Sequence, residues 1–569
     1  MGISHAATSL SPFANVGVLY LLLDIFGFLS VVLRGLILIA QSFTLGGIAF
    51  QLLLWRPLQA QLSAGSALIG KRFQTLLRFS AFAWGLLTIG SLALNAAVLT
   101  GTLQVSWTEA ASADFARADL VIAACAIGIA FLTRDASSNA RLATLLTLSL
   151  LALAMQLKLT HAASRLDVRW PLLLSDAGHM LGAGAWIGGL PYFLTALNGC
   201  KAVGESRLIG RRYSLMSIAS VVAIVGGGTV MAIKYVGSAD VIYGTAYGVM
   251  TSAKVGLLLM LLALGGSNYL LVERLRRDPS TPILRLKRFA EVELGIGLTV
   301  LFAAASLTSL PPGVDLAQDR LDWQEIVERA MPRWPLRLSS PGHDRLTISL
   351  LQAKIAAAEA QRTSASLAYV PGDGTFLPRS AEDIAWSEYN HHWAGVFVTL
   401  IGLLAMIEHF RWGRSAKHWP LLLLGMAVFM FFRNDEQAWP LGPIGFFESF
   451  RDPEVAQHRI FVLLIAVFGL FEWHVRLRGQ KAGPVALVFP LTTALGGALL
   501  LTHSHSIANI KDQLLIEMSH TPLALCGVAA GWARWLELRL GGRVGQMASW
   551  LWPVAFILVG LILLDYREA

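Results

Sequence analysis

The sequence predicts an all-α, polytopic integral membrane protein: a helical bundle of about fourteen transmembrane helices, in blocks of eight and six, with an extramembrane segment between them. Three observations predict this class. Hydrophobic residues make up 55% of the 569 residues and charged residues only 14%, against about 25% charged in soluble domains. Apolar runs of about 20 residues, long enough to cross a bilayer as a helix, recur along the whole chain. Basic residues gather in alternate loops.

The apolar runs place the spans in order. The first run, from about Asn15 to Trp55, is too long for one upright helix, so we expect a short interfacial lead-in followed by a span from about Ser30 to Leu54. Seven more spans of the first block are expected at roughly 73–99, 117–133, 141–160, 171–197, 213–236, 243–271 and 289–310. Six spans of the second block are expected at roughly 391–410, 417–433, 457–475, 484–502, 515–537 and 547–565.

A polar stretch from Pro311 to Asn390 separates the two blocks. It has no spanning run and contains one helix-like segment, from Leu346 to Arg362. It is expected to be either a small extramembrane domain or a packed loop. The sequence thus predicts an eight-helix domain at 1–312, an intervening segment at 313–390 and a six-helix domain at 391–569.

The loop charges predict the orientation of the chain. The basic loops include Arg56, Lys71 and Arg72; Arg207, Arg211 and Arg212; Arg274, Arg276 and Arg277; Arg411, Arg414 and Lys417; and Arg476, Arg478 and Lys481. By the positive-inside rule this set is cytoplasmic, so both termini and the 311–390 stretch are expected on the outer side. The formal charge of +9 then reflects topology, and no nucleic-acid partner is expected.

Two further features concern the cellular setting. The three cysteines, Cys125, Cys200 and Cys526, are far apart and form no CxxC, so no disulfide framework is expected. The N-terminus has no basic region and no small-residue cleavage pattern, so no cleaved signal peptide is expected.

The span at 171–197 carries polar side chains at helical spacing. Asp176, His179 and Met180 fall at i, i+3 and i+4 on one face, and Trp186 shares that face one heptad later. Five glycines in the same span are expected to let neighbouring helices approach closely: Gly178, Gly182, Gly184, Gly188 and Gly189. Two interpretations stay open. Asp176, His179 and Met180 line a polar cavity and bind a metal, or His179 bonds to a neighbouring helix and Met180 fills the core.

The second block presents several histidines near the outer face. They are His391, His392, His458, His503, His505 and His520. Imidazole suits copper and zinc, and a thioether such as Met518 favours Cu(I). Neither HExxH nor CxxC occurs, which argues against a hydrolytic zinc site. These histidines are therefore candidate metal ligands, with ordinary interfacial histidines as the alternative. Three inner acids of the same block, Glu408, Glu472 and Glu537, lie beside Arg411, Arg476 and Arg534 and are expected to form ion pairs.

The first block resembles the copper resistance protein D family of bacterial inner-membrane copper proteins over roughly Ser30 to Pro312. The residues that carry the resemblance are Arg34, Gly46-Gly47, Asp176, His179, Trp186-Ile-Gly-Gly-Leu190, Arg212-Tyr-Ser214, Gly226-Gly-Gly228, Tyr247-Gly248, Lys254, Asn268, Arg288, Glu293-Leu-Gly295 and Leu310-Pro-Pro312. The resemblance implies copper, as Cu(I) or Cu(II), handled at the bacterial inner membrane alongside a periplasmic copper carrier. It implies transport or homeostasis rather than an enzyme.

Two other functions stay open at this point. Paired helix histidines also bind haem axially in membrane b-type cytochromes, and His392, His458 and His520 supply candidates for that role. A structural membrane subunit without a metal is the third possibility. No phosphate loop, nucleophile triad or nucleic-acid module is found in the sequence.

Overall fold

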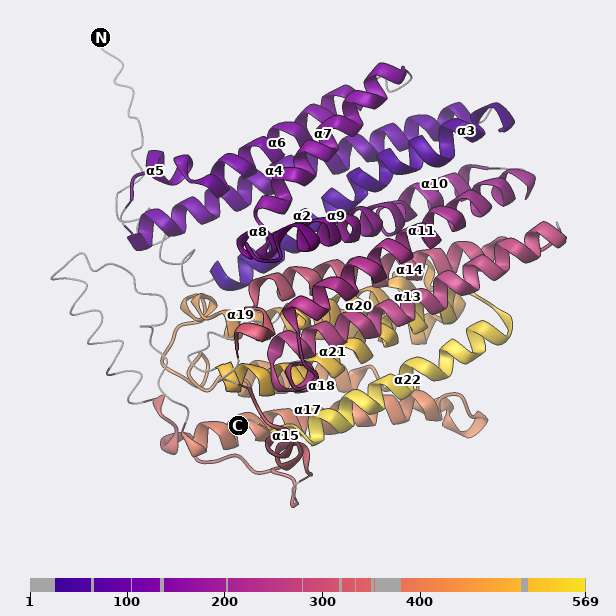
Figure 1. Cartoon of the computed structure of the whole chain (residues 1–569). Coiled ribbons are helices and arrows are strands. Elements are labelled where there is room, and N and C mark those ends of the chain that lie inside the picture. The colour runs from indigo at the N-terminus through magenta and orange to yellow at the C-terminus, as the bar shows by residue number, and fades with distance from the viewer. Residues whose placement is uncertain are drawn as a thin grey trace, which may run out of the picture.

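The computed structural model describes residues 26–62, 66–103, 105–133, 138–200, 203–278, 280–316, 320–332, 334–348, 353, 380–502 and 510–567. These residues form a bundle of long helices and contain no β-strand beyond one isolated bridge (Figure 1). Thirteen of the described helical segments are long and apolar enough to cross a membrane. The predicted fold class, an all-α polytopic membrane protein, is confirmed.

The first block contains the expected long helices. Their bounds are α2 Phe26–Phe50, α4 Ser66–Leu103, α6 Asp114–Leu132, α7 Asn139–Lys158, α9 Arg169–Trp186, α10 Leu190–Gly199, α11 Val203–Tyr235, α13 Ala246–Arg277 and α14 Leu284–Ser309. Short helices join them: α3 Arg56–Leu58, α5 Trp107–Ser112, α8 His161–Ser164 and α12 Ala239–Gly244. A π-helical turn, Gln51–Trp55, extends α2 directly.

The second block contains six long helices. Their bounds are α17 Ala381–Ile407, α18 Leu421–Arg433, α19 Pro453–Arg478, α20 Val488–Leu500, α21 Ile510–Arg539 and α22 Gly542–Leu564. The predicted span at 515–537 is present as α21, which is not among the thirteen apolar segments. This helix carries Glu517, His520, Arg534 and Glu537. It packs against α20, α22, α13 and α14, so it joins the two blocks.

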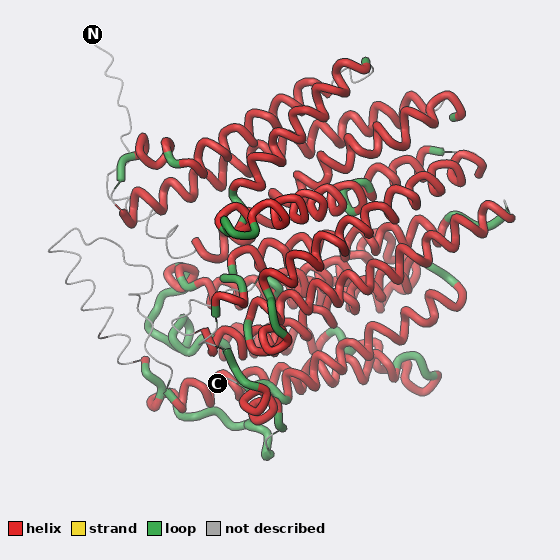
Figure 2. Tube along the Cα trace, in the orientation of Figure 1, coloured by secondary structure: helices red, strands yellow, loops and turns green. Residues whose placement is uncertain are grey.

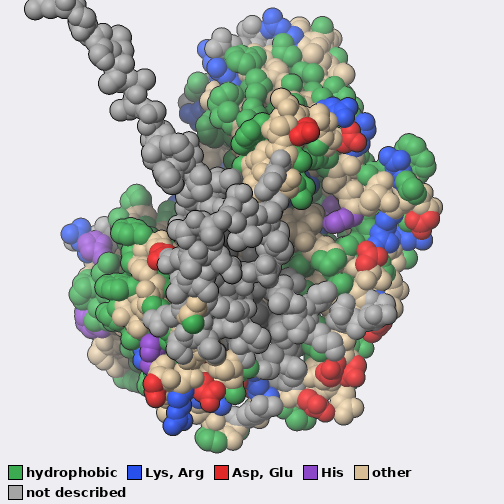
Figure 3. Space-filling view, turned by 90° about the vertical axis from the view of Figure 1, so that its left-hand side faces the viewer, with side chains coloured by type: hydrophobic (Ala, Val, Ile, Leu, Met, Phe, Trp, Pro, Cys, Tyr) green, Lys and Arg blue, Asp and Glu red, His purple; other side chains and the backbone are tan. Residues whose placement is uncertain are grey.

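The sides of the bundle are apolar, as a lipid environment requires. Large exposed hydrophobic side chains occur along most of the long helices, among them Phe79, Val222, Leu259, Leu463, Leu491 and Leu558. Charged and histidine side chains of the described residues lie at the end of the molecule that Figure 3 faces. The protein is therefore a multi-pass membrane protein surrounded by lipid.

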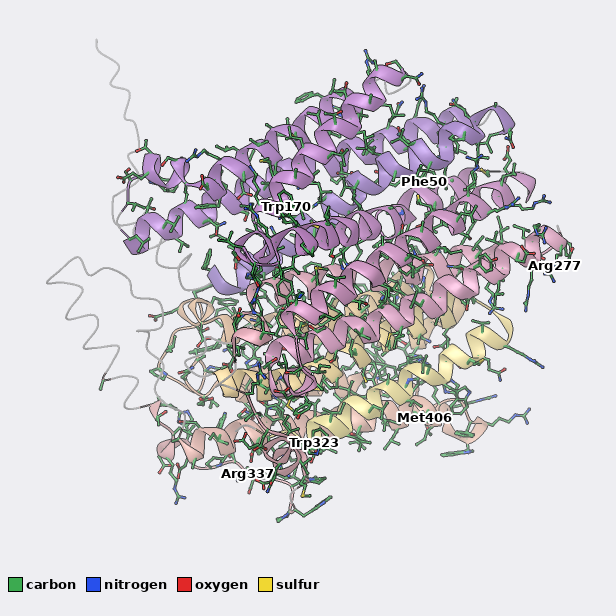
Figure 4. The ribbon with its side chains drawn as sticks, in the orientation of Figure 1. Phe50, Trp170, Arg277, Trp323, Arg337 and Met406 are labelled. Carbon is green, nitrogen blue, oxygen red and sulfur yellow. The ribbon has the colours of Figure 1, made fainter. Side chains whose placement is uncertain are left out.

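The two ends of the bundle separate the loops as the charge pattern predicts. Trp170, Trp323 and Arg337 lie toward one end of the helices, and Arg277 and Met406 lie toward the other (Figure 4). The longer described loops gather mainly at the first end (Figure 2). The predicted grouping of the loops thus fits the geometry, and the assignment of the first end to the outer side stays a prediction.

Several helices differ from the expected boundaries by up to ten residues, as at the start of α11, which is Val203 against an expected 213. The predicted 171–197 span is divided into α9 and α10 by a turn at Ile187–Gly189, because Pro191 at the start of α10 cannot donate a backbone hydrogen bond. Helix α17 begins ten residues earlier than expected, at Ala381, because Ser380 and Asp383 form a capping box. His391 and His392 therefore lie inside α17 and not at its start.

Glycines allow the closest helix crossings, as the sequence predicts. A Cβ atom at Gly188 would lie 1.8 Å from the Ser42 carbonyl oxygen, and one at Gly46 would lie 2.1 Å from the Gly188 carbonyl carbon. On the other side of α9, a Cβ at Gly182 would lie 2.8 Å from the Ser220 oxygen. Gly178 is the exception, since its Cβ would meet nothing within 4 Å. Close α2–α9 and α9–α11 packing therefore depends on particular glycines.

The described part of the intervening segment packs onto the helix ends. Leu321 donates its backbone N–H to the Gly244 carbonyl, and Arg320 pairs with Asp240 at 2.6 Å. Helix α15, Trp323–Ala330, follows with a capping box of Asp322 and Glu325. Hydrogen bonds from Ser238 and Arg320 lower the pKa of Asp240. The described residues of this segment thus form a packed loop, while most of the predicted helix at 346–362 lies outside the described residues.

Candidate metal-binding site

Three predicted histidines meet at one cavity in the second block. The cavity has a volume of about 360 Å³ and is lined by His391 of α17, His458 of α19 and His520 of α21. Met426 and Met430, one helical turn apart on α18, line the same cavity. Imidazole and thioether groups from four helices therefore surround one space.

Each of the three imidazoles has a nearby partner at Nδ1. The ring of His391 bonds to the Ser387 carbonyl oxygen at 2.9 Å, one turn earlier on α17. His458 bonds to the Asp435 carboxylate at 2.7 Å, and the ring of His520 lies 3.1 Å from the Ser519 hydroxyl oxygen. Contacts of this kind at Nδ1 fix the tautomer and the ring orientation of metal-binding histidines, which then bind the metal through Nε2.

His391 and His520 lie at a separation that suits a shared ion. Their ring centres are 6.2 Å apart. Two imidazoles on opposite sides of one ion have ring centres roughly 6 Å apart, since each metal–nitrogen bond is about 2 Å long. The ring of Tyr566 stacks on His391 with a centre-to-centre distance of 3.6 Å and holds it in place. No three His, Cys, Asp or Glu side chains of the described residues are arranged as a complete metal site.

Acidic residues also line the cavity, in and near the loop between α18 and α19. Asp435, Asp452 and Glu454 are among its lining residues. Asp452 caps α19 by accepting the backbone N–H groups of Glu454 and Val455. Burial, with repulsion from Glu454, raises the pKa of Asp452 to about 6. These carboxylates make the cavity attractive to cations.

The remaining predicted residues of the second block have other surroundings. Both ring nitrogens of His392 contact backbone groups, at Arg337 and at the Tyr566 carbonyl oxygen, and its side chain is 7% exposed. Met518 packs against the cluster of Leu321, Ile326 and Leu514. His503 and His505 lie outside the described residues. His392 therefore contacts backbone groups and does not line the cavity, although its neighbour in the sequence does.

In the first block, His179 faces α11. Its Nδ1 lies 3.0 Å from the Ile224 carbonyl oxygen. Gly227 allows the close approach of α9 and α11 here, because a Cβ at Gly227 would lie 3.3 Å from the His179 Cβ and closer still to the Ser175 carbonyl oxygen. Met180 and Asp176 are half-buried beside it. The structure therefore turns this polar face toward the helices of the first block.

Asp176 lies among charges that its helical spacing does not reveal. Lys254 of α13 and Arg34 of α2 both act on it electrostatically. Lys254 and Arg34 stood out in the sequence only through the family resemblance and had no assigned role. The sequence feature that could have indicated this contact is Lys254 itself, because a lysine inside a membrane span needs an acidic partner.

The end of the second block opposite the histidine cavity holds a network of ion pairs. Glu472 is fully buried and accepts hydrogen bonds from Arg476 and Arg534, both at 2.7 Å. Arg476 also pairs with Glu408, and Arg534 with Glu537. The predicted ion pairing of the three inner acids is confirmed, with Arg476 in place of Arg411 as the partner of Glu408.

Four residues that carried the family resemblance form one buried group in the first block. Trp186 Nε1 donates to Glu293 at 2.5 Å, and Asn268 Nδ2 donates to the other oxygen of that carboxyl at 2.7 Å. The Tyr213 hydroxyl donates to the Trp186 carbonyl oxygen at 2.6 Å. The residues come from α9, α11, α13 and α14, so separate parts of the resemblance meet at one point in the fold.

A comparison with known protein families matches the segment that contains most of this buried group. Residues 207–307, which include Tyr213, Lys254, Asn268 and Glu293, match the family model described as Copper resistance protein D. The match covers this segment alone and shows what it is similar to. The resemblance predicted from the sequence is thereby confirmed.

A curated relative supports the same assignment. The copper transport protein CutJ of Bacillus subtilis (strain 168) is 28% identical over 159 residues, which are 27% of this chain and 28% of that protein. The match thus covers little more than a quarter of the relative's length. No solved structure matches the chain. The second block and its histidine cavity lie outside the matched family segment.

Proposed function

We propose that this chain transports copper across the bacterial inner membrane, or controls its level there, and receives copper at the cavity of His391, His458 and His520. It acts as a transporter rather than an enzyme. The observation that carries the proposal is that imidazoles from α17, α19 and α21 line one cavity. The family segment and the copper transport protein among its relatives support copper as the cargo.

The chemistry of the cavity favours Cu(I). His391 and His520 are spaced for a two-coordinate ion, and Cu(I) accepts few, soft ligands. Met430 and Met426 supply thioethers in the same space. His503 and His505 shortly precede α21 in the sequence, and they are proposed as further copper ligands.

In the first block, His179 and Met180 are the proposed inner binding pair, with Asp176 beside them. About two turns separate His179 from the outer end of the span, which corresponds to roughly 12 Å. A periplasmic copper carrier is the proposed donor, and the acidic residues around the cavity are suited to attracting the ion it releases. This direction requires the outer end of the bundle to face the periplasm.

Copper accumulation in spheroplasts tests the proposal. The His391→Ala/His520→Ala variant should accumulate no copper when it is present in the membrane at the wild-type amount, because two of the three cavity imidazoles are removed. His409→Ala is a matched control. Like His391, His409 bonds to a backbone carbonyl four residues earlier, that of Ala405, and packs on an aromatic ring, that of Trp550. It does not line the cavity. Unchanged accumulation in the double variant would refute the cavity as the copper entrance.

The same purified protein separates copper binding from haem binding. A b-type cytochrome would show a haem absorption band that His391→Ala abolishes. We expect copper and no such band. If the purified protein shows a haem band, the cavity has a redox function and the proposal of copper transport is wrong. If no preparation contains either copper or haem, the protein is a structural membrane subunit.

A further inference from the structure

The buried carboxyl of Glu293 forms a second candidate site, remote from the histidine cavity. Its side chain is 3% exposed and accepts one hydrogen bond on each oxygen, from Trp186 and from Asn268. Tyr213 fixes Trp186 from the opposite side by donating to its backbone carbonyl. The carboxyl is thus held by neutral donors from two helices.

Glu293 has no cationic partner among the described residues. Helices α9 and α13 present only the neutral donors Trp186 and Asn268 to it, and the Tyr213 phenol of α11 is the titratable group that faces it. No Lys, Arg or His of the described parts of α2, α10, α20 or α21, which also pack on α14, forms an ion pair with it. Glu472 in the second block, by contrast, has two arginine partners. Nothing in the described part of the chain therefore neutralises Glu293 when it is ionised.

A cavity reaches this carboxyl. It has a volume of about 320 Å³ and is lined by Glu293, Asn268, Tyr213, Ser214 and Ser217 among mainly apolar residues. The Oδ1 atom of Asn268 is buried and has no hydrogen-bond partner among the described residues. A water molecule occupies about 30 Å³ of liquid, so several waters fit, and an unpaired buried oxygen is the kind of group that holds one. The cavity therefore provides space for water beside Glu293, with which the carboxyl can exchange a proton.

A proton fits this site better than a metal ion does. Hard cations need about six oxygen ligands, whereas the groups nearest the carboxyl are two N–H donors, which repel a cation. Cu(I) prefers soft ligands, and the described lining of this cavity contains no His, Met or Cys. Burial favours the neutral form of a carboxyl while the two donors favour the ionised form, so both forms are accessible.

We propose that Glu293 is a proton-carrying residue of the first block, which releases a proton to the cavity water when copper crosses and takes one up again afterwards. The inference rests on the proposed copper transport. In one cycle the carboxyl O–H bond breaks, the proton passes to water, and one Cu(I) crosses in the opposite direction. The exchange of one positive charge for another leaves the net charge in the membrane unchanged.

Proteoliposomes that contain the full-length protein and an entrapped pH dye test this exchange. Addition of Cu(I) outside wild-type vesicles should give copper uptake with proton release in the opposite direction. Glu293→Gln cannot release the proton, so uptake and proton movement should both fall at least tenfold while copper bound per protein stays the same. Glu293→Asp should restore part of both.

Glu291→Gln provides the matched control. Glu291 lies two residues away on α14 but is ion-paired with Arg288 and Arg539 and receives the Trp535 N–H. Glu291→Gln should keep wild-type copper uptake and proton movement. A Glu293→Gln protein that moves copper and protons at the wild-type rate would overturn the inference and leave copper transport intact.

An infrared measurement separates failure of this inference from failure of copper transport. The wild-type protein should show the carbonyl stretch of a protonated carboxyl that shifts in heavy water and disappears in Glu293→Gln but not in Glu291→Gln. This readout needs no copper. Absence of a band specific to Glu293 at every pH between about 4 and 9 would refute proton exchange, even in a protein that transports copper.

Discussion

The crossing of α2 over α9 gives the sharpest test of the packing. In Gly188→Ala, the new methyl carbon would lie 1.8 Å from the Ser42 carbonyl oxygen, whereas ordinary contact begins at 3.4 Å. The helices must therefore separate by about 1.6 Å, because the obstructing atom belongs to the backbone and cannot rotate away. Overpacking typically costs about 1–3 kcal/mol, and this clash with backbone atoms places Gly188→Ala at the upper end of that range.

Gly178→Ala is the internal comparison for that substitution. Gly178 lies in α9, and a methyl group added there would meet nothing within 4 Å, so alanine adds about 1 kcal/mol of helix propensity without a clash. Denaturant titration in one detergent, followed by helix content, should show Gly188→Ala destabilised and Gly178→Ala unchanged or stabilised. Equal stability of the two variants would refute the close α2–α9 crossing.

Three other predictions follow from the structure. Glu472→Gln should cost about 3–5 kcal/mol in the same titration, because it leaves Arg476 and Arg534 without their shared partner; a cost below about 1 kcal/mol contradicts this. In a protein without its native cysteines, Ser339→Cys should react with an impermeant thiol reagent in intact spheroplasts, and Ser415→Cys only after lysis; the reverse pattern would invert the topology. His179→Ala should abolish copper accumulation at equal membrane abundance, and unchanged accumulation would reduce His179 to a packing residue.

Much of the fold could be predicted because the bilayer imposes a simple rule on the sequence. Spans need about 20 apolar residues, and loop charges alternate, so the long helices could be located, although their ends differ from the apolar runs by up to ten residues. Two of the differences have identifiable local causes. Capping by Ser380 extends α17 beyond the apolar run, and the turn before Pro191 divides α9 from α10. A hydropathy profile contains no signal for a helix cap or for such a turn.

The candidate site could be predicted only in part. His391 and His392 are neighbours in the sequence, but a helix turns by about 100° per residue, so only His391 lines the cavity while His392 contacts backbone groups. The pairing of His458 with Asp435 depends on the fold of the loop between α18 and α19. Tyr566, which stacks on His391, gave no signal in the sequence because nothing local links it to α17.

The contacts of Glu293 with Trp186 and Asn268 could likewise not be predicted from the sequence. Each residue was visible as part of the family resemblance, yet their contacts join residues 107 and 25 positions apart in the chain. Periodicity relates residues within one helix and says nothing about which helices are neighbours. Only the fold shows that they surround one carboxyl.

Copper bound per purified protein, measured by mass spectrometry after loading with Cu(I) and removal of free metal, tests the central claim most directly. We expect at least one copper ion in the wild-type protein and in His409→Ala, and loss of that ion in His391→Ala/His520→Ala. Equal copper content in all three proteins would contradict the assignment of the cavity between α17, α19 and α21 as the copper site.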